Sequence, residues 1–128
     1  MKQLLIIDDD AVSVLILKKM LINAGFLDNP MIFKNGNEAI NFLNSNYKSI
    51  EKYFIFLDIN MPIMNGWEFL EEIEPKINTE NFSVYLLTSS TSEQDIIKSK
   101  NYKSIKKFIS KPVAKEILSE IKEEFYLR

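Results

Sequence analysis

The sequence predicts an α/β domain in which a doubly wound, five-stranded parallel sheet is covered by helices on both faces. Short apolar runs alternate five times with segments of helical character, and no segment is repeated along the 128 residues. Strands that alternate with helices form parallel sheets, because each right-handed crossover packs its helix onto the sheet. The three glycines, Gly25, Gly36 and Gly66, all fall between expected elements. A hydrophobic content of 46% is enough for one core, so we expect a single domain.

The five expected strands are short apolar runs bounded by polar or turn residues. The third is the clearest, because residues 54–57 are all large and apolar and lead directly into Asp58. A continuous run of this kind is typical of a strand that is buried on both faces of a sheet. The expected strands span residues 3–7, 30–33, 53–58, 82–87 and 105–109.

Five helices are expected to follow these strands. For the first helix, Asp10 is the expected N-cap and Gly25 the C-terminal stop. The third helix should end before Pro75, which disfavours a helical conformation in the residue that precedes it. The fourth is polar, with Ile96 and Ile97 as its main apolar residues. The expected helices span residues 11–24, 38–43, 67–73, 92–100 and 113–126.

The composition excludes several classes of function. The net charge is −2, from 16 basic and 18 acidic residues. It is not the strongly basic charge expected of a protein that binds nucleic acid or an anionic membrane. The N-terminal apolar run is too short for a signal peptide, so we expect a cytoplasmic protein. The absence of cysteine and histidine excludes thiolate sites and Ser-His-Asp catalysis. The groups that remain available for chemistry are carboxylates, hydroxyls, lysines and a bound hard metal ion.

Four of the five expected strands are followed by a reactive side chain. Asp8 and Asp9 follow the first strand, Asp58 ends the third, Thr88 follows the fourth and Lys111 follows the fifth. The carboxyl ends of parallel strands lie at one edge of the sheet, so these side chains should converge there. Clustered carboxylates beside a hydroxyl and an ammonium group suit a phosphoryl group with Mg²⁺, which prefers one or two carboxylates together with phosphate oxygens.

The order and spacing of these residues resemble the receiver domain of two-component response regulators. The similarity covers essentially the whole chain, and its motifs are highly specific in combination. They are Asp8-Asp9, Asp58-x-x-Met61-Pro62-x-Met64-x-Gly66, Thr88 and Lys111-Pro112. The resemblance implies a flavodoxin-like sheet with strand order 2-1-3-4-5. It also implies that residues 1–128 form one stand-alone receiver domain without an output domain.

The resemblance also implies the role of each residue at the sheet edge. Asp58 would accept a phosphoryl group from a histidine of a partner. The side chains of Asp9 and Asp58 and the backbone carbonyl of Asn60 would hold Mg²⁺, while Asp8 would orient the metal through water. Lys111 would bind phosphoryl oxygens, as its charge independently suggests. The protein would then catalyse only its own phosphorylation and dephosphorylation and would not be an enzyme acting on other substrates.

A switch is implied as well. Thr88 would move toward the phosphoryl group, and the ring of Phe108, three positions before the lysine, would turn inward; an ordinary core role for Phe108 is the alternative. Ser89 stands where the family often has Ala or Gly, which would alter access to the phosphoryl group. Asn60 and Ser90 occupy positions that tune dephosphorylation, and since neither is a base we expect slow hydrolysis.

The expected partners are proteins. A sensor histidine kinase or a histidine phosphotransfer protein would supply the phosphoryl group, and an unidentified protein would receive the signal. The lysine-rich segment 98–107 borders the face that family members use for partners; a solvated charged surface is its simpler interpretation. Five properties stay open: the kinase, the target, the choice between output and relay, the phosphoryl lifetime and the oligomeric state.

Two other functions compete with this one. In a phosphohydrolase similar to haloacid dehalogenases, Asp8 would be the nucleophile and Asp10 the general acid, with Thr88 and Lys111 in later motifs. That family needs an acidic motif after its lysine, whereas Asp58 precedes Lys111 here. The second alternative is an interaction module that keeps the fold and works without phosphorylation.

Overall fold

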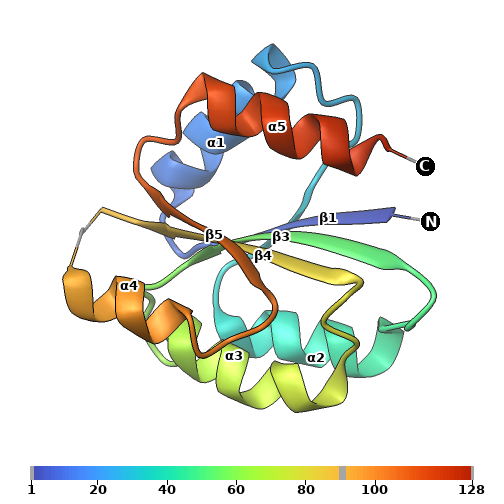
Figure 1. Ribbon diagram of the computed structural model, residues 1–128, viewed down its shortest axis with the longest axis vertical. Coiled ribbons are helices and arrows are strands. Elements are labelled where there is room, and N and C mark those ends of the chain that lie inside the picture. Colours follow the sequence, from blue (N-terminus) through green and yellow to red (C-terminus); the bar gives the residue numbers. More distant parts are fainter. Residues whose placement is uncertain (1, 90–91, 128) are drawn as a thin grey trace.

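The computed structural model describes residues 2–89 and 92–127, and these form one parallel sheet between two layers of helices (Figure 1). The sheet order is β2-β1-β3-β4-β5, and every neighbouring pair is parallel. This confirms the predicted fold class and strand order. The strands are β1 (Lys2–Ile7), β2 (Met31–Phe33), β3 (Lys52–Asp58), β4 (Phe82–Thr88) and β5 (Ile105–Ser110).

The helices divide between the two faces of the sheet. Figure 1 shows α1 and α5 on one face and α2, α3 and α4 on the other. Their bounds are α1 (Ala11–Asn23), α2 (Gly36–Asn46), α3 (Gly66–Ile73), α4 (Glu93–Ser99) and α5 (Lys115–Phe125), with a 3₁₀ helix η1 (Glu74–Lys76) after α3.

Two apolar cores lie between the sheet and these helices. Alternate residues of each strand face opposite layers, so Ile55 packs with α2 and α3 while Phe54 and Phe56 pack with α1 and α5. All seven residues of β4 are buried, as expected for a strand covered on both faces. The central strands therefore form a rigid base, and their carboxyl ends have fixed positions.

The ends of several helices differ from the expected ones for local reasons. The side chain of Asn35 accepts a hydrogen bond from the backbone N–H of Glu38 at 2.9 Å, so α2 begins at Gly36. Helix α5 begins at Lys115, because Ala114 is still extended. Pro75 lies inside η1, at a position where a missing N–H is tolerated.

Helix α4 is the least buried of the helices on its face. Ile96 and Ile97, its two isoleucines, are 38% and 64% exposed, and the buried residue of the helix is Ser99. The helix and the turn after it contact α3 through Trp67, which lies under the ammonium group of Lys98 at 4.9 Å and stacks on the ring of Tyr102 at 5.8 Å. These ring contacts connect α4 to the helix that follows the β3 loop.

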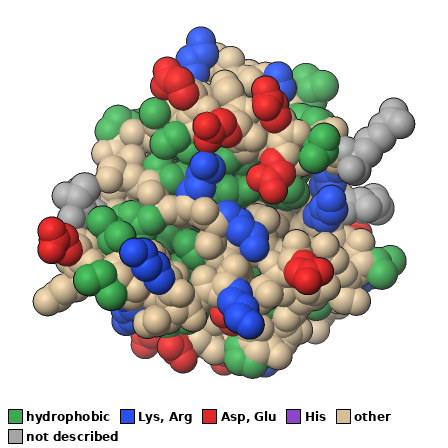
Figure 2. Space-filling view, viewed as in Figure 1, with side chains coloured by type: hydrophobic (Ala, Val, Ile, Leu, Met, Phe, Trp, Pro, Cys, Tyr) green, Lys and Arg blue, Asp and Glu red, His purple; other side chains and the backbone are tan. Residues whose placement is uncertain are grey.

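Basic side chains lie over the middle of the face seen in Figure 2, where Figure 1 shows β5, with acidic side chains around them. Besides Lys98, which lies over Trp67, two further lysines of the segment 98–107 have partners within the protein. Lys107 pairs with Glu120 at 3.0 Å, and the ammonium group of Lys106 donates to the backbone carbonyls of Thr79 and Lys103. Among the described residues, no helix has the length and apolar character needed to cross a membrane.

Candidate functional site

The carboxyl edge of the sheet brings Asp8, Asp58, Thr88 and Lys111 into one neighbourhood. The register pairs Ile7 with Leu57, so Asp8, just past the end of β1, lies beside Asp58, the last residue of β3. The backbone N–H of Asp8 also donates to the carbonyl of Phe33 at 3.0 Å, which ties it to the other neighbouring strand.

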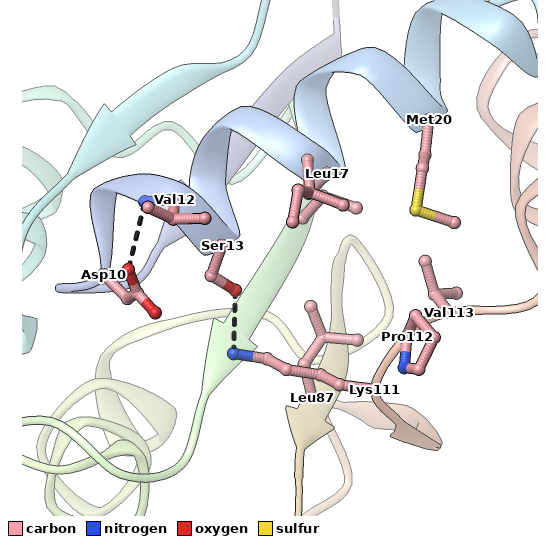
Figure 3. Close-up of a pocket in the computed structure, with 10 residues that line it drawn as sticks. Asp10, Val12, Ser13, Leu17, Met20, Leu87, Lys111, Pro112 and Val113 are labelled. Atoms are coloured by element: carbon pink, nitrogen blue, oxygen red, sulfur yellow. Dashed lines mark hydrogen bonds between the residues drawn. The ribbon is translucent and has the colours of Figure 1, made fainter.

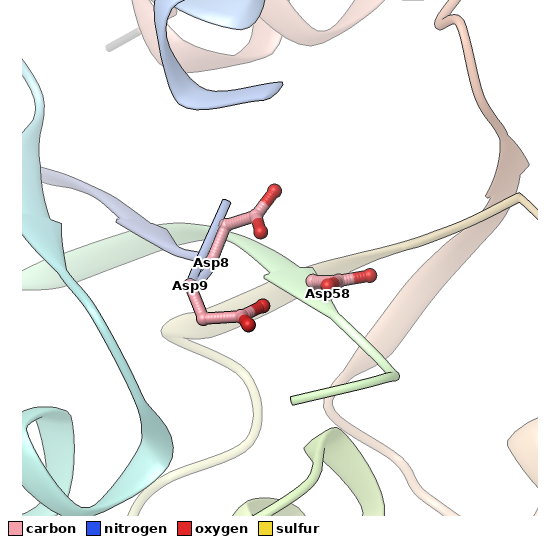
Figure 4. A group of neighbouring side chains, drawn as sticks. All are labelled: Asp8, Asp9 and Asp58. Atoms are coloured by element: carbon pink, nitrogen blue, oxygen red, sulfur yellow. The ribbon is translucent and has the colours of Figure 1, made fainter. Parts of the chain in front are cut away.

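Three carboxylates form an acidic cluster at this edge. Asp8, Asp9 and Asp58 each place one carboxylate oxygen within 4.8 Å of the others (Figure 4). Asp8 and Asp58 are buried, and Asp9 is exposed. Anionic oxygens gathered this closely are a donor set for a hard divalent cation such as Mg²⁺, which also retains water ligands. The cluster therefore fits the metal that the sequence implied.

Lys111 supplies the positive charge of the site. Its ammonium nitrogen lies 3.2 Å from a carboxylate oxygen of Asp8 and 3.5 Å from one of Asp58. Its backbone N–H donates to the carbonyl of Thr88 at 2.7 Å, so β4 holds the start of the segment after β5. The lysine can therefore reach a group attached to Asp58 without any movement of the backbone.

Burial raises the pKa of the Asp58 carboxyl from its ordinary value of 3.8 to about 6. The negative charge of Asp8 raises this pKa further, while the positive charge of Lys111 and hydrogen bonds from Lys111 and the backbone N–H of Asn60 lower it. A negative charge on Asp58 is therefore costly here unless additional positive charge is present.

The loop after β3 packs closely against the site. The backbone N–H of Gly66 donates to the carbonyl of Ile59 at 2.8 Å. A Cβ atom at Gly66 would lie only 2.8 Å from the backbone carbonyl oxygen of Asp58, a distance that requires the backbone to shift. Ile63 has a φ of 70°, which is unfavourable for a β-branched residue, and the backbone N–H of Met64 closes a tight turn onto the carbonyl of Pro62 at 2.7 Å.

The remaining candidate residues surround this centre. Thr88 is fully buried at the end of β4. Phe108 is half-buried on β5 and packs against the core beneath α2 and α3. The side chains of Asn60 and Ser89 are exposed. Ser90 lies outside the described residues, so the expectation for that position stays a prediction.

The sequence did not indicate Ser13, which the structure places at the site. Its hydroxyl oxygen accepts a hydrogen bond from the ammonium group of Lys111 at 3.0 Å. The two residues are 98 positions apart, and a serine in the first turn of a helix carries no signal of its own. Asp10, the alternative general acid, is the N-cap of α1 and accepts from the backbone N–H of Val12 at 3.0 Å.

Comparison with known proteins identifies the family. The family model for the response regulator receiver domain matches residues 4–122, so this chain belongs to the response regulator receiver family. The family acts in two-component signalling and is not a class of conventional enzymes, which decides against the phosphohydrolase alternative.

Relatives and solved structures agree with this assignment. The chain is 25% identical over 122 residues to a chemotaxis protein CheY homolog of Campylobacter jejuni, covering 95% of this chain and 90% of the relative. It is 28% identical over 127 residues to hybrid signal transduction histidine kinase L of Dictyostelium discoideum, covering 96% of this chain and only 7% of the kinase. The crystal structure of a two-component response regulator from Cytophaga hutchinsonii superimposes with a TM-score of 0.80 at 26% identity, covering 97% of this chain and 96% of that structure.

Proposed function

We propose that this receiver accepts a phosphoryl group on Asp58 from a phosphohistidine of a partner protein, and that this event switches its contacts with other proteins. The observation that carries the proposal is the position of the Asp58 carboxylate. It lies buried at the sheet edge, within 3.5 Å of the Lys111 ammonium group and beside two further carboxylates. A nucleophilic carboxylate, a fixed positive charge and an acidic cluster that can hold a divalent cation together supply the positioning and charge stabilisation that in-line phosphoryl transfer needs.

Magnesium is the expected cofactor. Asp9, Asp58 and the backbone carbonyl of Asn60 would hold it, with Asp8 bound through water, as the family resemblance implies. When bound, Mg²⁺ would neutralise charge on the phosphoryl oxygens and on the acidic cluster. The close approach of three carboxylate oxygens is the feature of this chain that supports a cation there.

Two residues of the chain, Asp58 and Lys111, would carry out the transfer step. A carboxylate oxygen of Asp58 attacks the phosphorus atom in line with the phosphorus–nitrogen bond of the donor histidine. The new oxygen–phosphorus bond forms as the bond to nitrogen breaks, and the imidazole leaves with the electron pair and takes up a proton. The Lys111 ammonium group donates to the phosphoryl oxygens, where the negative charge is spread.

The switch follows from the charge of the product. An acyl phosphate carries up to two negative charges and strong acceptor oxygens. The hydroxyl of Thr88 would turn toward these oxygens, and the ring of Phe108 would move inward into the space beside it. Phosphorylation would thus shift the population between two arrangements of β4, β5 and α4.

The direct test is to locate the phosphoryl group. The protein would be incubated with a small phosphodonor and Mg²⁺, the acyl phosphate trapped by borohydride reduction, and its position read by peptide mass spectrometry. We expect modification of Asp58, with none in Asp58→Asn and none in the presence of EDTA. Label on Asp8 in place of Asp58 would overturn the proposal.

The partners are part of the same proposal. A sensor histidine kinase or a histidine phosphotransfer protein would be the donor, and a protein target would read the phosphorylated state of a cytoplasmic receiver. A pull-down that compares beryllofluoride-loaded with untreated protein should retain the target only on the loaded form. Normal signalling in cells by Asp58→Asn would show that the domain works without phosphorylation.

A further inference from the structure

Lys111 has a long side chain and needs anchoring. Its four-carbon stem is flexible, and the loss of rotamer entropy opposes holding a lysine in one place. The side chain is 25% exposed, so water is an available alternative environment for the ammonium group. The contacts of the ammonium group therefore determine the fraction of time for which it lies beside Asp58.

In the described part of the chain, the ammonium nitrogen of Lys111 contacts three side-chain oxygens. The shortest contact is to the hydroxyl oxygen of Ser13 at 3.0 Å, followed by Asp8 at 3.2 Å and Asp58 at 3.5 Å. Figure 3 shows the serine reaching down from α1 to the end of the lysine side chain. Both residues line a groove of about 280 Å³ between α1 and the segment after β5.

The position of Ser13 is fixed by the helix that carries it. The side chain of Asp10 caps α1, and the next residue after the serine, Val14, is buried in the core beneath the helix. Capping and burial hold the first turns of α1 in place, so the hydroxyl presents its oxygen to Lys111 from a rigid element.

The serine differs from the other two partners in its chemistry. Asp8 and Asp58 belong to the acidic cluster, so a bound cation would weaken their attraction for the ammonium group. On phosphorylation, the carboxylate charge of Asp58 would be replaced by negative charge on the phosphoryl oxygens, so this partner of the ammonium group would change as well. The hydroxyl of Ser13 is neutral and lies outside this cluster. Its hydrogen bond therefore does not depend on the occupancy of the metal site or on the state of Asp58.

From these contacts we propose that Ser13 is a positioning residue, which keeps the Lys111 ammonium group directed at the phosphoryl group throughout the transfer. This inference rests on the proposed function and adds a residue to it. Ser13 does not touch the reacting atoms; it acts through Lys111.

The kinetic test uses a small phosphodonor with saturating Mg²⁺, so that docking of a protein donor plays no part. Ser13→Ala should phosphorylate roughly three- to ten-fold more slowly than wild type, the effect of losing one hydrogen bond to a charged group. Ser13→Thr retains the hydroxyl and should restore most of the rate. Val12→Ala is the matched control, because Val12 lines the same groove, is 64% exposed and has no side-chain polar atom, and its rate should equal that of wild type.

A double-mutant cycle separates positioning from a general structural effect. If Ser13 acts through the lysine, Lys111→Ala and the double variant Ser13→Ala/Lys111→Ala should have equal residual rates. An equal slowing by Ser13→Ala in both backgrounds would overturn the inference. Circular dichroism and urea unfolding would establish that every variant is folded.

A spectroscopic measurement tests the contact itself. In ¹⁵N-lysine-labelled protein, the Lys111 ammonium resonance should exchange slowly with water in wild type and Ser13→Thr, and should broaden in Ser13→Ala. Equal rates and equal spectra for wild type and Ser13→Ala would overturn the inference while leaving the proposed function intact. A wild-type protein that is not phosphorylated on Asp58 at all would overturn the proposed function, and this inference with it.

Discussion

The Asp58 carboxyl illustrates how the environment of one residue serves the proposed chemistry. Burial and the charge of Asp8 disfavour its ionised form, and Lys111 only partly offsets them. A carboxylate that is poorly stabilised by its surroundings gains most from a neighbouring cation and from the loss of its own charge on conversion to an acyl phosphate. The cost of this arrangement should be visible in the stability of the metal-free protein.

Asp58→Asn should therefore stabilise the protein in EDTA at pH 8. The raised pKa means that the folded protein binds the proton more tightly than the unfolded chain, so wild type loses stability as the pH rises from 3.8 through about 6. A shift of this size corresponds to about 2 kcal/mol after allowance for solvent screening at the open side of the site. Urea unfolding at pH 8 and pH 4 measures the difference.

The stability that Asp58→Asn gains over wild type should be lost at pH 4, where the Asp58 carboxyl of the folded wild-type protein is protonated. Asp28→Asn is a matched control, because that carboxylate is exposed and outside the acidic cluster, and an amide oxygen can still accept the hydrogen bond that the Tyr126 hydroxyl donates at 2.7 Å. An Asp58→Asn variant less stable than wild type at pH 8 would show that Lys111 more than compensates for burial.

At the scale of the elements, the loop between β3 and α3 has to pass close to the end of β3, where Asp58 lies. Gly66→Ala should destabilise the protein by about 2 kcal/mol, since the added Cβ would meet the backbone of Asp58 and Ile59 and force a shift. The same shift should slow phosphorylation of Asp58 by a small phosphodonor. Thermal unfolding and the phosphorylation rate are the measurements.

Gly36→Ala provides the comparison for this substitution. The added Cβ at Gly36 would also come within 2.9 Å of other atoms, but these are the Cγ and Sδ atoms of Met64, whose side chain can rotate, whereas the atoms at Gly66 belong to the backbone. We expect a loss of stability of about 1 kcal/mol or less, smaller than that of Gly66→Ala. Equal losses for the two alanine variants would mean that the loop after Asp58 tolerates displacement.

A second contact between elements holds the α4–β5 turn against η1. The carboxylate of Glu74 accepts hydrogen bonds from the hydroxyl of Ser104 at 2.6 Å and from the backbone N–H groups of Lys103 and Ser104 at 3.2 and 3.3 Å. Ser104 is fully buried, so its polar atoms depend on this partner.

Glu74→Ala should therefore lower the free energy of unfolding by about 2 kcal/mol, because buried donors would lose their acceptor. Glu72→Ala, an exposed glutamate two residues earlier in α3, should change stability by less than about 0.5 kcal/mol. Chemical denaturation of both variants tests the difference. Similar values for the two would show that water replaces Glu74 as the partner of Ser104.

For the whole molecule, cation binding to the acidic cluster should stabilise the fold. A ligand that binds only the folded state adds about 1.4 kcal/mol when its concentration is ten times its Kd. We therefore expect Mg²⁺ to raise the Tm of wild type and to leave that of Asp9→Asn nearly unchanged. Differential scanning calorimetry across a magnesium titration measures this, and an equal rise in both proteins would point to non-specific ion binding.

Much of this architecture could be predicted from the sequence, because the sheet is buried on both faces. Continuous apolar runs such as residues 54–57 indicate strands, and a parallel sheet then places Asp8, Asp58 and Lys111 at one edge. What could not be predicted depends on side-chain contacts between distant segments. The bond from Lys111 to Ser13 and the bonds from Ser104 to Glu74 join residues that no local pattern relates. The ends of α2 and α5 depend on the local backbone at Asn35 and Ala114, which apolar spacing does not reveal.

The contacts of Trp67 have one more consequence. It is the single tryptophan of the chain, sits directly after Gly66 at the start of α3, and touches α4 and the following turn through Lys98 and Tyr102. The protein thus carries an intrinsic fluorophore at the junction between the Asp58 loop and α4. Its emission should change whenever α4 separates from α3, so the conformational response to beryllofluoride can be followed in real time without a label.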